Sequence, residues 1–220
     1  MKPSFWHKCW ERDSLGFHQE TVHPFLEQFL LPRLTSTDQH VFVPLCGKSL
    51  DMVWFAQRMK VSGAELSEIA CRDFFKEKEL SYKHQKHGGF NVFSCDNVQL
   101  WQGDFFKLHP TDIKDIDWIY DRAAIIALPE SMQQQYVEHL STFISEQTSL
   151  FLISLEFPQE ELEGPPFSIS SLKVAQLFSE FDVESIAEHE LEDKKFAQRT
   201  FDVSQLIERL YLIRKKHEFN

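Results

Sequence analysis

The sequence predicts an α/β protein with a doubly wound, mostly parallel, Rossmann-like sheet of seven strands. Three observations favour this class. Apolar runs typical of buried strands alternate with stretches of helical periodicity. The predominantly apolar run 149–157 is expected of a strand covered on both faces. Two alternating runs near the C-terminus, 182–188 and 206–214, predict an antiparallel pair.

The N-terminal part is aromatic and charged, and it precedes the first strand. Apolar residues recur at helical spacing over 22–31 and predict a helix that Pro32 should end. We expect residues 1–34 to form a helical lid on a single domain that spans 1–220, although length alone leaves two domains open.

The remaining elements follow in order. Strands are predicted over 41–45 and 61–66, with helices over 50–57 and 67–80. The polar segment 81–89 ends in two glycines and is interpreted as a connection. Further strands are predicted over 91–95, 98–102 and 117–120, a helix opened by Pro129, and a helix over 172–178.

Composition and charge exclude several partners. The formal net charge of -11 and the pI near 5.4 disfavour nucleic acids and anionic membranes. The four cysteines show no Cys-x-x-Cys spacing and indicate reduced thiols. No apolar run approaches the roughly 20 residues needed to span a bilayer. We therefore expect a cytoplasmic protein, and we expect it to be a monomer.

The most informative motif joins a glycine turn to an acid. Gly47 follows the strand 41–45, and Glu65 ends the next strand, twenty residues after Leu45. A glycine turn opening a helix, followed by a carboxylate at the tip of the next strand, is typical of sites for nucleoside-bearing cofactors. The alternative is that Glu65 caps the helix near Ser67. A phosphate-binding loop is disfavoured because Phe42 stands where that motif needs glycine.

Other residues at strand ends should lie near this turn, because ligands of such sheets bind beyond the carboxyl ends of the strands. Asp104 and Phe105 are predicted to flank an adenine. Asp104 would contact the exocyclic amine of the adenine, and the ring of Phe105 would pack against the adenine face. The alternative is a turn acid and a core phenylalanine. The ten histidines show no convincing two-ligand spacing, so we expect no metal.

Several strings resemble the thiopurine S-methyltransferase family over residues 5–211, in its bacterial form. They are Val43-Pro-Leu-Cys-Gly-Lys-Ser-Leu-Asp-Met52, Glu65-Leu-Ser-Glu68, Leu100-Trp-Gln-Gly-Asp-Phe-Phe106, Tyr120-Asp-Arg-Ala-Ala124 and Gly16-Phe17-His18-Gln19-Glu20. The resemblance implies a class I methyltransferase fold that uses S-adenosylmethionine. It also implies methyl transfer to the sulfur of small aromatic or heterocyclic thiols such as thiopurines.

The resemblance also assigns residues. The implied cofactor contacts are Trp10, Leu45, Glu65, Asp104, Phe105 and Arg122. Phe17 matches the substrate side, and Arg199 is the nearest residue to an arginine that the family places at Ala197. Trp10 and Phe17 are alternatively core aromatics. Arg122 would hold the cofactor carboxylate or stabilise a thiolate, and the alternative is a salt bridge with Asp121.

Three other functions stay open at this point. The family likeness leaves room for methylation of selenium or tellurium species. A second alternative is a protein that retains the fold and binds the cofactor but has no catalytic activity. A nicotinamide-dependent oxidoreductase is disfavoured, because Gly47 stands alone where a dinucleotide fold would show three glycines.

Overall fold

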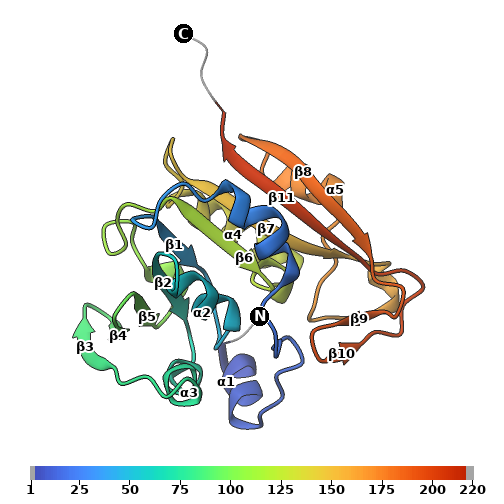
Figure 1. The fold of residues 1–220 in the computed structure, drawn as a ribbon. Helices are drawn as coiled ribbons and strands as arrows, with labels where there is room; N and C mark the ends of the chain where they lie inside the picture. The colour runs from blue at the N-terminus through green and yellow to red at the C-terminus, as the bar shows by residue number, and fades with distance from the viewer. Residues whose placement is uncertain (1–2, 217–220) are drawn as a thin grey trace. The chain divides into compact units, whose positions relative to one another are not determined.

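A computed structural model describes residues 3–216 of the chain. It comprises two compact units, Met1–Asp115 and Ile116–Asn220, each with its own strands and helices (Figure 1). The single domain expected over 1–220 stays a prediction.

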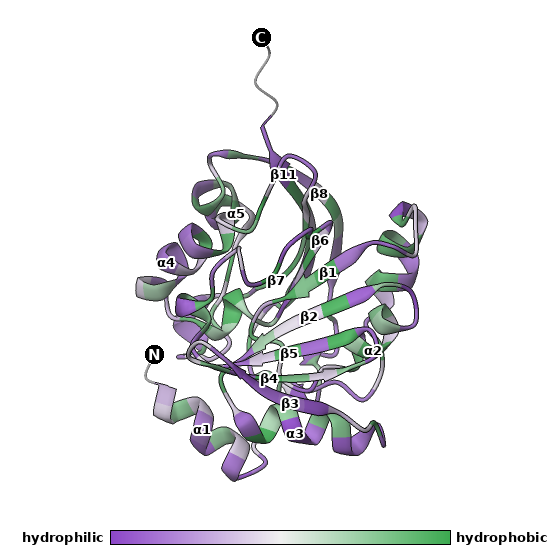
Figure 2. Cartoon of the chain, turned by 90° about the vertical axis from the view of Figure 1, so that its left-hand side faces the viewer, coloured by the Kyte–Doolittle hydropathy of each residue, from purple (hydrophilic) through white to green (hydrophobic). Residues whose placement is uncertain are grey.

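The first unit contains five strands in the order β3-β4-β5-β2-β1, which lie side by side in Figure 2. Their bounds are His40–Val43 for β1, Lys60–Glu65 for β2, Lys83–His87 for β3, Phe90–Cys95 for β4 and Val98–Gln102 for β5. β2 pairs in parallel with both β1 and β5, whereas β4 pairs antiparallel with β5 and β3. The parallel strands bring the residues that follow β1, β2 and β5 to one edge of this sheet.

Short helices accompany these strands. They are α1 Pro3–Glu11, the π-helix η1 Leu26–Leu30, the 3-10 helices η2 Leu31–Arg33 and η3 Phe105–Lys107, α2 Leu50–Ala56 and α3 Glu68–Glu77. Serine caps open α2 and α3: Ser49 Oγ accepts from the Asp51 N–H, and Ser67 Oγ accepts from the Ala70 N–H. The helix predicted over 22–31 is present as an unbroken helical run over 24–33, of π type in η1 and 3-10 type in η2, and Pro32 lies inside η2 instead of ending the helix.

One sequence interpretation was wrong. The segment 81–89 is not a connection, because it contains β3, which pairs with β4 from Lys83 to His87. All five residues of β3 are exposed and hydrophilic, as its purple colour in Figure 2 shows. A strand without an apolar face carries no hydrophobic alternation, so pattern analysis could not detect it.

The second unit contains four sheet strands in the order β6-β7-β11-β8. Their bounds are Trp118–Arg122 for β6, Ser149–Glu156 for β7, Phe181–Glu190 for β8 and Ile207–Lys215 for β11. β6 and β7 are parallel, and β11 runs antiparallel to both β7 and β8. The predicted C-terminal antiparallel pair is therefore confirmed. A separate hairpin joins β9 Lys195–Phe196 to β10 Arg199–Thr200.

The helices of this unit are α4 Glu130–Ser141, α5 Ser171–Leu177 and the 3-10 helices η4 Ile125–Ala127 and η5 Gln159–Glu161. Pro129 occupies the N-cap position of α4. β7 is buried at every position except Glu156, as its apolar sequence predicted. The α/β class is thus confirmed. The described residues hold nine sheet strands, whereas the predicted fold class has seven and eight strand ranges were predicted one by one; the additional strand is β3.

Candidate functional site

The turn after β1 bends the backbone sharply before α2 begins. Leu45 and Gly47 have φ values of +46° and +54°, in the left-handed region that glycine adopts most easily. The Cys46 N–H donates to the Ala64 carbonyl of β2 over 2.9 Å, which holds the bend against the neighbouring strand. The predicted bend is present, and Leu45 lies half-buried within it.

Glu65 ends β2, and its carboxylate bridges this turn and the start of α3. Oε2 accepts from the Gly47 N–H over 2.8 Å, and Oε1 accepts from the Ser67 N–H over 2.6 Å. Glu65 is only 6% exposed, and burial raises its pKa while the backbone N–H groups of Ser67, Gly47 and Leu66 oppose that shift. Because a carboxylate offers about four lone-pair sites, it can accept from a ligand as well as from these backbone donors. This capacity suits the paired hydroxyls of a ribose.

Two aromatic rings lie directly against Gly47. A Cβ atom added to this glycine would lie 3.3 Å from Cζ2 of Trp10 and 3.7 Å from Cε2 of Phe17. The two rings meet edge to face, with centroids 5.8 Å apart. Trp10 is also a core residue, because it is 5% exposed and packs with Leu15 and Ala70. The interpretation of Trp10 as a core aromatic is therefore confirmed, and ligand contact by either ring stays a prediction.

The end of β5 lies beside Glu65. The Gly103 N–H donates to the Glu65 carbonyl over 2.8 Å, and Asp104 follows with an exposed carboxylate that caps η3. Phe105 is 3% exposed and its ring stacks on Phe42 of β1, with centroids 6.3 Å apart. Phe105 thus occupies the core and Asp104 the surface, and the adenine contacts of both stay predictions.

Two features of this region were missed from the sequence. Lys48 Nζ lies 2.6 Å from Glu77 Oε1, which ties the turn to the last residue of α3. A Cβ atom added to Gly63 would lie 2.6 Å from Cys46 Sγ and 2.7 Å from Leu100 Cδ2, so the turn can pack here only against glycine. The ion pair has no local signal, whereas a glycine inside a strand does indicate close packing.

Arg122 ends β6 in the second unit, next to the buried Asp121. The Asp121 carboxylate accepts from the N–H groups of Ala124 and Ile125 over 3.1 and 3.3 Å and from the Tyr136 hydroxyl over 2.8 Å. Burial raises the pKa of Asp121 to about 6 despite these donors. Successive strand residues point to opposite faces, so Arg122 points away from this carboxylate. The alternative predicted for Arg122 was an ion pair with Asp121. Within residues 3–216, the contacts of the Asp121 carboxylate do not include this ion pair. Ligand binding by Arg122 stays a prediction.

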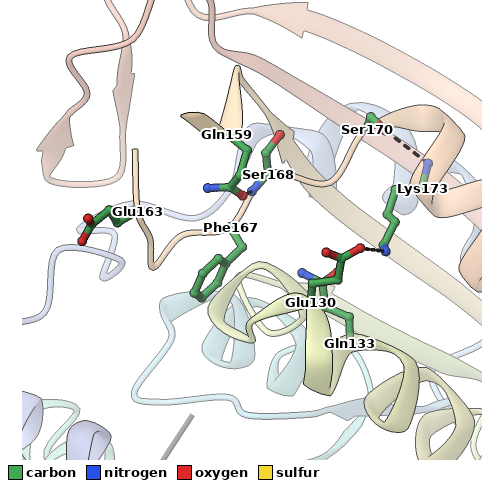
Figure 3. Close-up of a pocket in the computed structure, with 8 residues that line it drawn as sticks. All are labelled: Glu130, Gln133, Gln159, Glu163, Phe167, Ser168, Ser170 and Lys173. Carbon is green, nitrogen blue, oxygen red and sulfur yellow. Dashed lines mark hydrogen bonds and ion pairs between the residues drawn. The ribbon is translucent and has the colours of Figure 1, made fainter. Parts of the chain in front are cut away.

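A cavity of about 570 Å³ opens in the second unit, where α4 begins after β6 and a long loop follows β7 (Figure 3). It is lined by Glu130, Gln133, Gln159, Glu163, Phe167, Ser168, Ser170 and Lys173. Arg199 of β10 donates to the Pro165 carbonyl of the same loop over 3.0 Å without lining the cavity. Arg199 therefore holds the loop, and its contact with a substrate stays a prediction.

Residues 3–216 lack two kinds of feature. No group of three or more His, Cys, Asp or Glu side chains is placed to hold a metal ion. Among these residues, every helix falls short of the length and apolar content that a bilayer-spanning helix needs.

Solved structures of low sequence identity define the class of the fold. A SAM-dependent methyltransferase from Anabaena variabilis matches 97% of this chain and 95% of its own, with a TM-score of 0.67 at 15% identity. A Burkholderia thailandensis N1-methyltransferase solved with S-adenosylhomocysteine matches 97% of this chain and 87% of its own, with a TM-score of 0.63 at 10% identity. The fold is that of the S-adenosylmethionine-dependent methyltransferases.

The family follows from sequence similarity. The family model described as thiopurine S-methyltransferase matches residues 1–216. A Pseudomonas fluorescens protein named thiopurine S-methyltransferase is 40% identical over 220 residues, which cover 98% of both chains. The chain belongs to the thiopurine S-methyltransferase family, and it is an enzyme that uses S-adenosylmethionine.

Proposed function

We propose that this methyltransferase transfers the methyl group of S-adenosylmethionine to the sulfur of small aromatic or heterocyclic thiols, thiopurines among them. The hydrogen bond between Gly47 and Glu65, in a chain of this family, is the observation that carries the proposal. The names of the relatives supply the thiol class.

The first unit offers the groups that this cofactor requires. Glu65 can accept from the ribose hydroxyls, and Gly47 lets the backbone approach the ligand. Asp104 can accept from the adenine amine, beside Gly103, which is bonded to Glu65. In this proposal Leu45 and Phe105 supply apolar surface near the cofactor. Arg122 holds the cofactor carboxylate or stabilises a thiolate.

The chemistry needs alignment more than acid or base catalysis. When bound, S-adenosylmethionine supplies a methyl group on a positively charged sulfur. Aligning two reactants can contribute roughly 7 to 11 kcal/mol to rate acceleration. Aromatic heterocyclic thiols are more acidic than a cysteine thiol, whose pKa is about 8.5, so many are ionised near neutral pH. The faces of Trp10 and Phe17 suit a cation and a flat substrate, and they exclude water.

Thermal melting with S-adenosylhomocysteine tests the cofactor site. Ligand at about 100 times its Kd adds roughly 2.7 kcal/mol, which raises Tm by about 5 to 11 °C for a chain of this length. Methyl transfer to 6-mercaptopurine, followed by mass spectrometry, tests the acceptor class. Cofactor binding without methylation of any thiol would instead favour an idle protein, and methylation only of selenium or tellurium compounds would change the acceptor class.

We further infer a monomer that acts in the cytoplasm. The four cysteines, Cys9, Cys46, Cys71 and Cys95, are all free thiols, as expected in a reducing compartment. Light scattering at micromolar concentration would show a mass near 26.0 kDa if the chain is monomeric.

A further inference from the structure

A chain of side-chain hydrogen bonds crosses the first unit and ends next to Glu65. His84 Nε2 lies 3.2 Å from Asn91 Oδ1, and Asn91 Nδ2 donates to Gln102 Oε1 over 2.7 Å. Gln102 Nε2 in turn donates to the Leu66 carbonyl over 2.8 Å. The chain thus runs from β3 through β4 and β5 to the residue after β2, along strands that are neighbours in Figure 2. None of these side chains belongs to the cofactor contacts assigned above.

The direction of each bond in this chain is fixed. The Leu66 carbonyl can only accept, so the Gln102 amide must turn its nitrogen toward Leu66 and its oxygen toward β4. Asn91 must then donate its nitrogen to that oxygen, which leaves the Asn91 oxygen to accept from His84. His84 therefore carries a proton on Nε2, and its ring stacks on Phe93 with centroids 4.7 Å apart. Each amide is held in one orientation by its two neighbours.

Gln102 and Glu65 hold the two ends of one peptide group. The Leu66 carbonyl and the Ser67 N–H belong to the same planar trans peptide, in which they point in opposite directions. Gln102 binds the carbonyl, and Glu65 Oε1 accepts from the N–H over 2.6 Å. Because the peptide is planar, a rotation of this group moves both ends together. A donor on the carbonyl also polarises the peptide, which strengthens the bond from its N–H to the carboxylate.

The Gln102 side chain acts where backbone pairing ends. In the parallel pair of β2 and β5, Glu65 lies opposite Gln102, and the Gly103 N–H donates to the Glu65 carbonyl over 2.8 Å. The next carbonyl, that of Leu66, lies beyond the last residue of β2 and is bound by the Gln102 side chain. Leu66 is partly exposed, so without Gln102 its carbonyl would be free to turn toward water. The Ser67 N–H would then turn away from Glu65.

We propose that Gln102 is a positioning residue for the cofactor site. Through the peptide between Leu66 and Ser67 it orients the Glu65 carboxylate toward the ribose hydroxyls. Asn91 and His84 hold the Gln102 amide in the orientation that this requires. The inference rests on the proposed function, because it needs Glu65 to bind the ribose of the cofactor.

Gln102→Met tests this role, because methionine has a similar length but forms neither hydrogen bond. The Kd of S-adenosylhomocysteine, measured by isothermal titration calorimetry, should rise about 2- to 10-fold, the scale of one neutral hydrogen bond. In Gln102→Glu the new carboxylate still accepts from Asn91 but cannot donate to Leu66. The Kd should rise at least as much in this variant, and a wild-type Kd in folded Gln102→Glu would overturn the inference.

Gln99 of the same strand provides the matched control. Its Oε1 accepts from Trp101 Nε1 over 3.0 Å, so its side-chain bond stays within β5. Gln99→Met removes an amide from β5 and leaves the buried Trp101 without this partner, and it should lower the free energy of unfolding in urea as Gln102→Met does. The Kd of S-adenosylhomocysteine should nevertheless stay at the wild-type value. An equal rise in both variants would identify a purely structural effect and overturn the inference.

The Ser67 amide proton gives a readout that needs no ligand. An N–H bonded to a carboxylate has a downfield NMR signal, which should move upfield in Gln102→Met and stay in place in Gln99→Met. If the wild-type chain bound no S-adenosylhomocysteine, the proposed function would fail, and an unmoved Ser67 signal would separately refute the positioning role. A wild-type Kd in Glu65→Ala would overturn both the ribose assignment and the inference. A wild-type Kd in Gln102→Met alone would overturn only the inference.

Discussion

Oε2 of Glu65 accepts the N–H of Gly47 over 2.8 Å, so the acid at the end of β2 and the glycine turn after β1 are joined by one hydrogen bond. The strands that carry them are parallel neighbours, with Val43 opposite Gly63. The second oxygen of the same carboxylate holds Ser67 at the start of α3. A change at Glu65 therefore acts on two strand ends at once.

Removal of the Glu65 carboxylate should weaken cofactor binding. Glu65→Ala is expected to cost about 1 to 3 kcal/mol of S-adenosylhomocysteine binding, the scale for a lost buried hydrogen-bond partner. Isothermal titration calorimetry measures this loss directly. Glu68→Gln, on the first turn of α3 and paired with the exposed Arg72, is the matched control and should bind normally. Equal affinity of Glu65→Ala and wild type would remove Glu65 from the site.

Gly47 is expected to be intolerant of a side chain for two separable reasons. Alanine at a left-handed position costs about 1 to 2 kcal/mol, and contact with Trp10 at 3.3 Å adds about 1 kcal/mol or more. Gly88 has a similar φ of +56° but no atom within 4 Å of an added Cβ. Urea denaturation of Gly47→Ala and Gly88→Ala therefore isolates the packing contribution. The same free energy of unfolding in both variants would contradict this account.

Phe17 should act on the acceptor and not on the cofactor. Phe17→Ala removes one of the two aromatic rings that lie against Gly47. It is expected to raise KM for the thiol several-fold, because the lost aromatic contact is worth roughly 1 kcal/mol or more of binding free energy. The Kd of S-adenosylhomocysteine should stay close to the wild-type value. Phe5→Ala, which removes an exposed ring of α1, serves as the control. A loss confined to cofactor affinity would reverse the assignment.

Asp121 should make the stability of the protein depend on pH. Its pKa is raised from 3.8 to about 6 by burial, so the folded state keeps a proton that the unfolded state releases. Because the folded state binds more protons between these values, the free energy of unfolding falls as pH rises from about 4 to 6, by roughly 3 kcal/mol. Asp121→Asn should show a smaller decrease than wild type, because the raised pKa of Glu65 still contributes in the same direction.

Urea denaturation at pH 4, 5, 6 and 7 checks the pH prediction. The exposed Asp202→Asn is the control and should show the wild-type decrease. If Asp121→Asn lost as much stability over this range as wild type, another group would be responsible.

The parts of the site that follow from local pattern could be predicted from the sequence. An apolar run, a glycine and an acid at a fixed spacing located Gly47 and Glu65 on neighbouring strand ends, and the structure joins them. The serine caps of α2 and α3 are equally local signals. Contacts between distant positions left no such signal, as the Lys48–Glu77 ion pair shows.

Partner choice was also beyond the sequence. Asp121 had an adjacent arginine as its obvious partner, yet it is held by Tyr136 and two backbone donors. Alternation along a strand explains this outcome, because neighbours in sequence face opposite sides. Gln133 lies in an ordinary amphipathic helix of the sequence, and only the fold shows that it lines a cavity.

β3 lies at the end of the strand order in its unit, so one of its edges presents unpaired backbone groups. Such an edge invites a strand of another molecule to add to the sheet, which is a route to aggregation. β3 is short, and Lys83 and Lys86 place charges along it that a docking strand would have to desolvate. The polar sequence of β3, which is why no strand was predicted there, thus protects the protein against fibrous self-association.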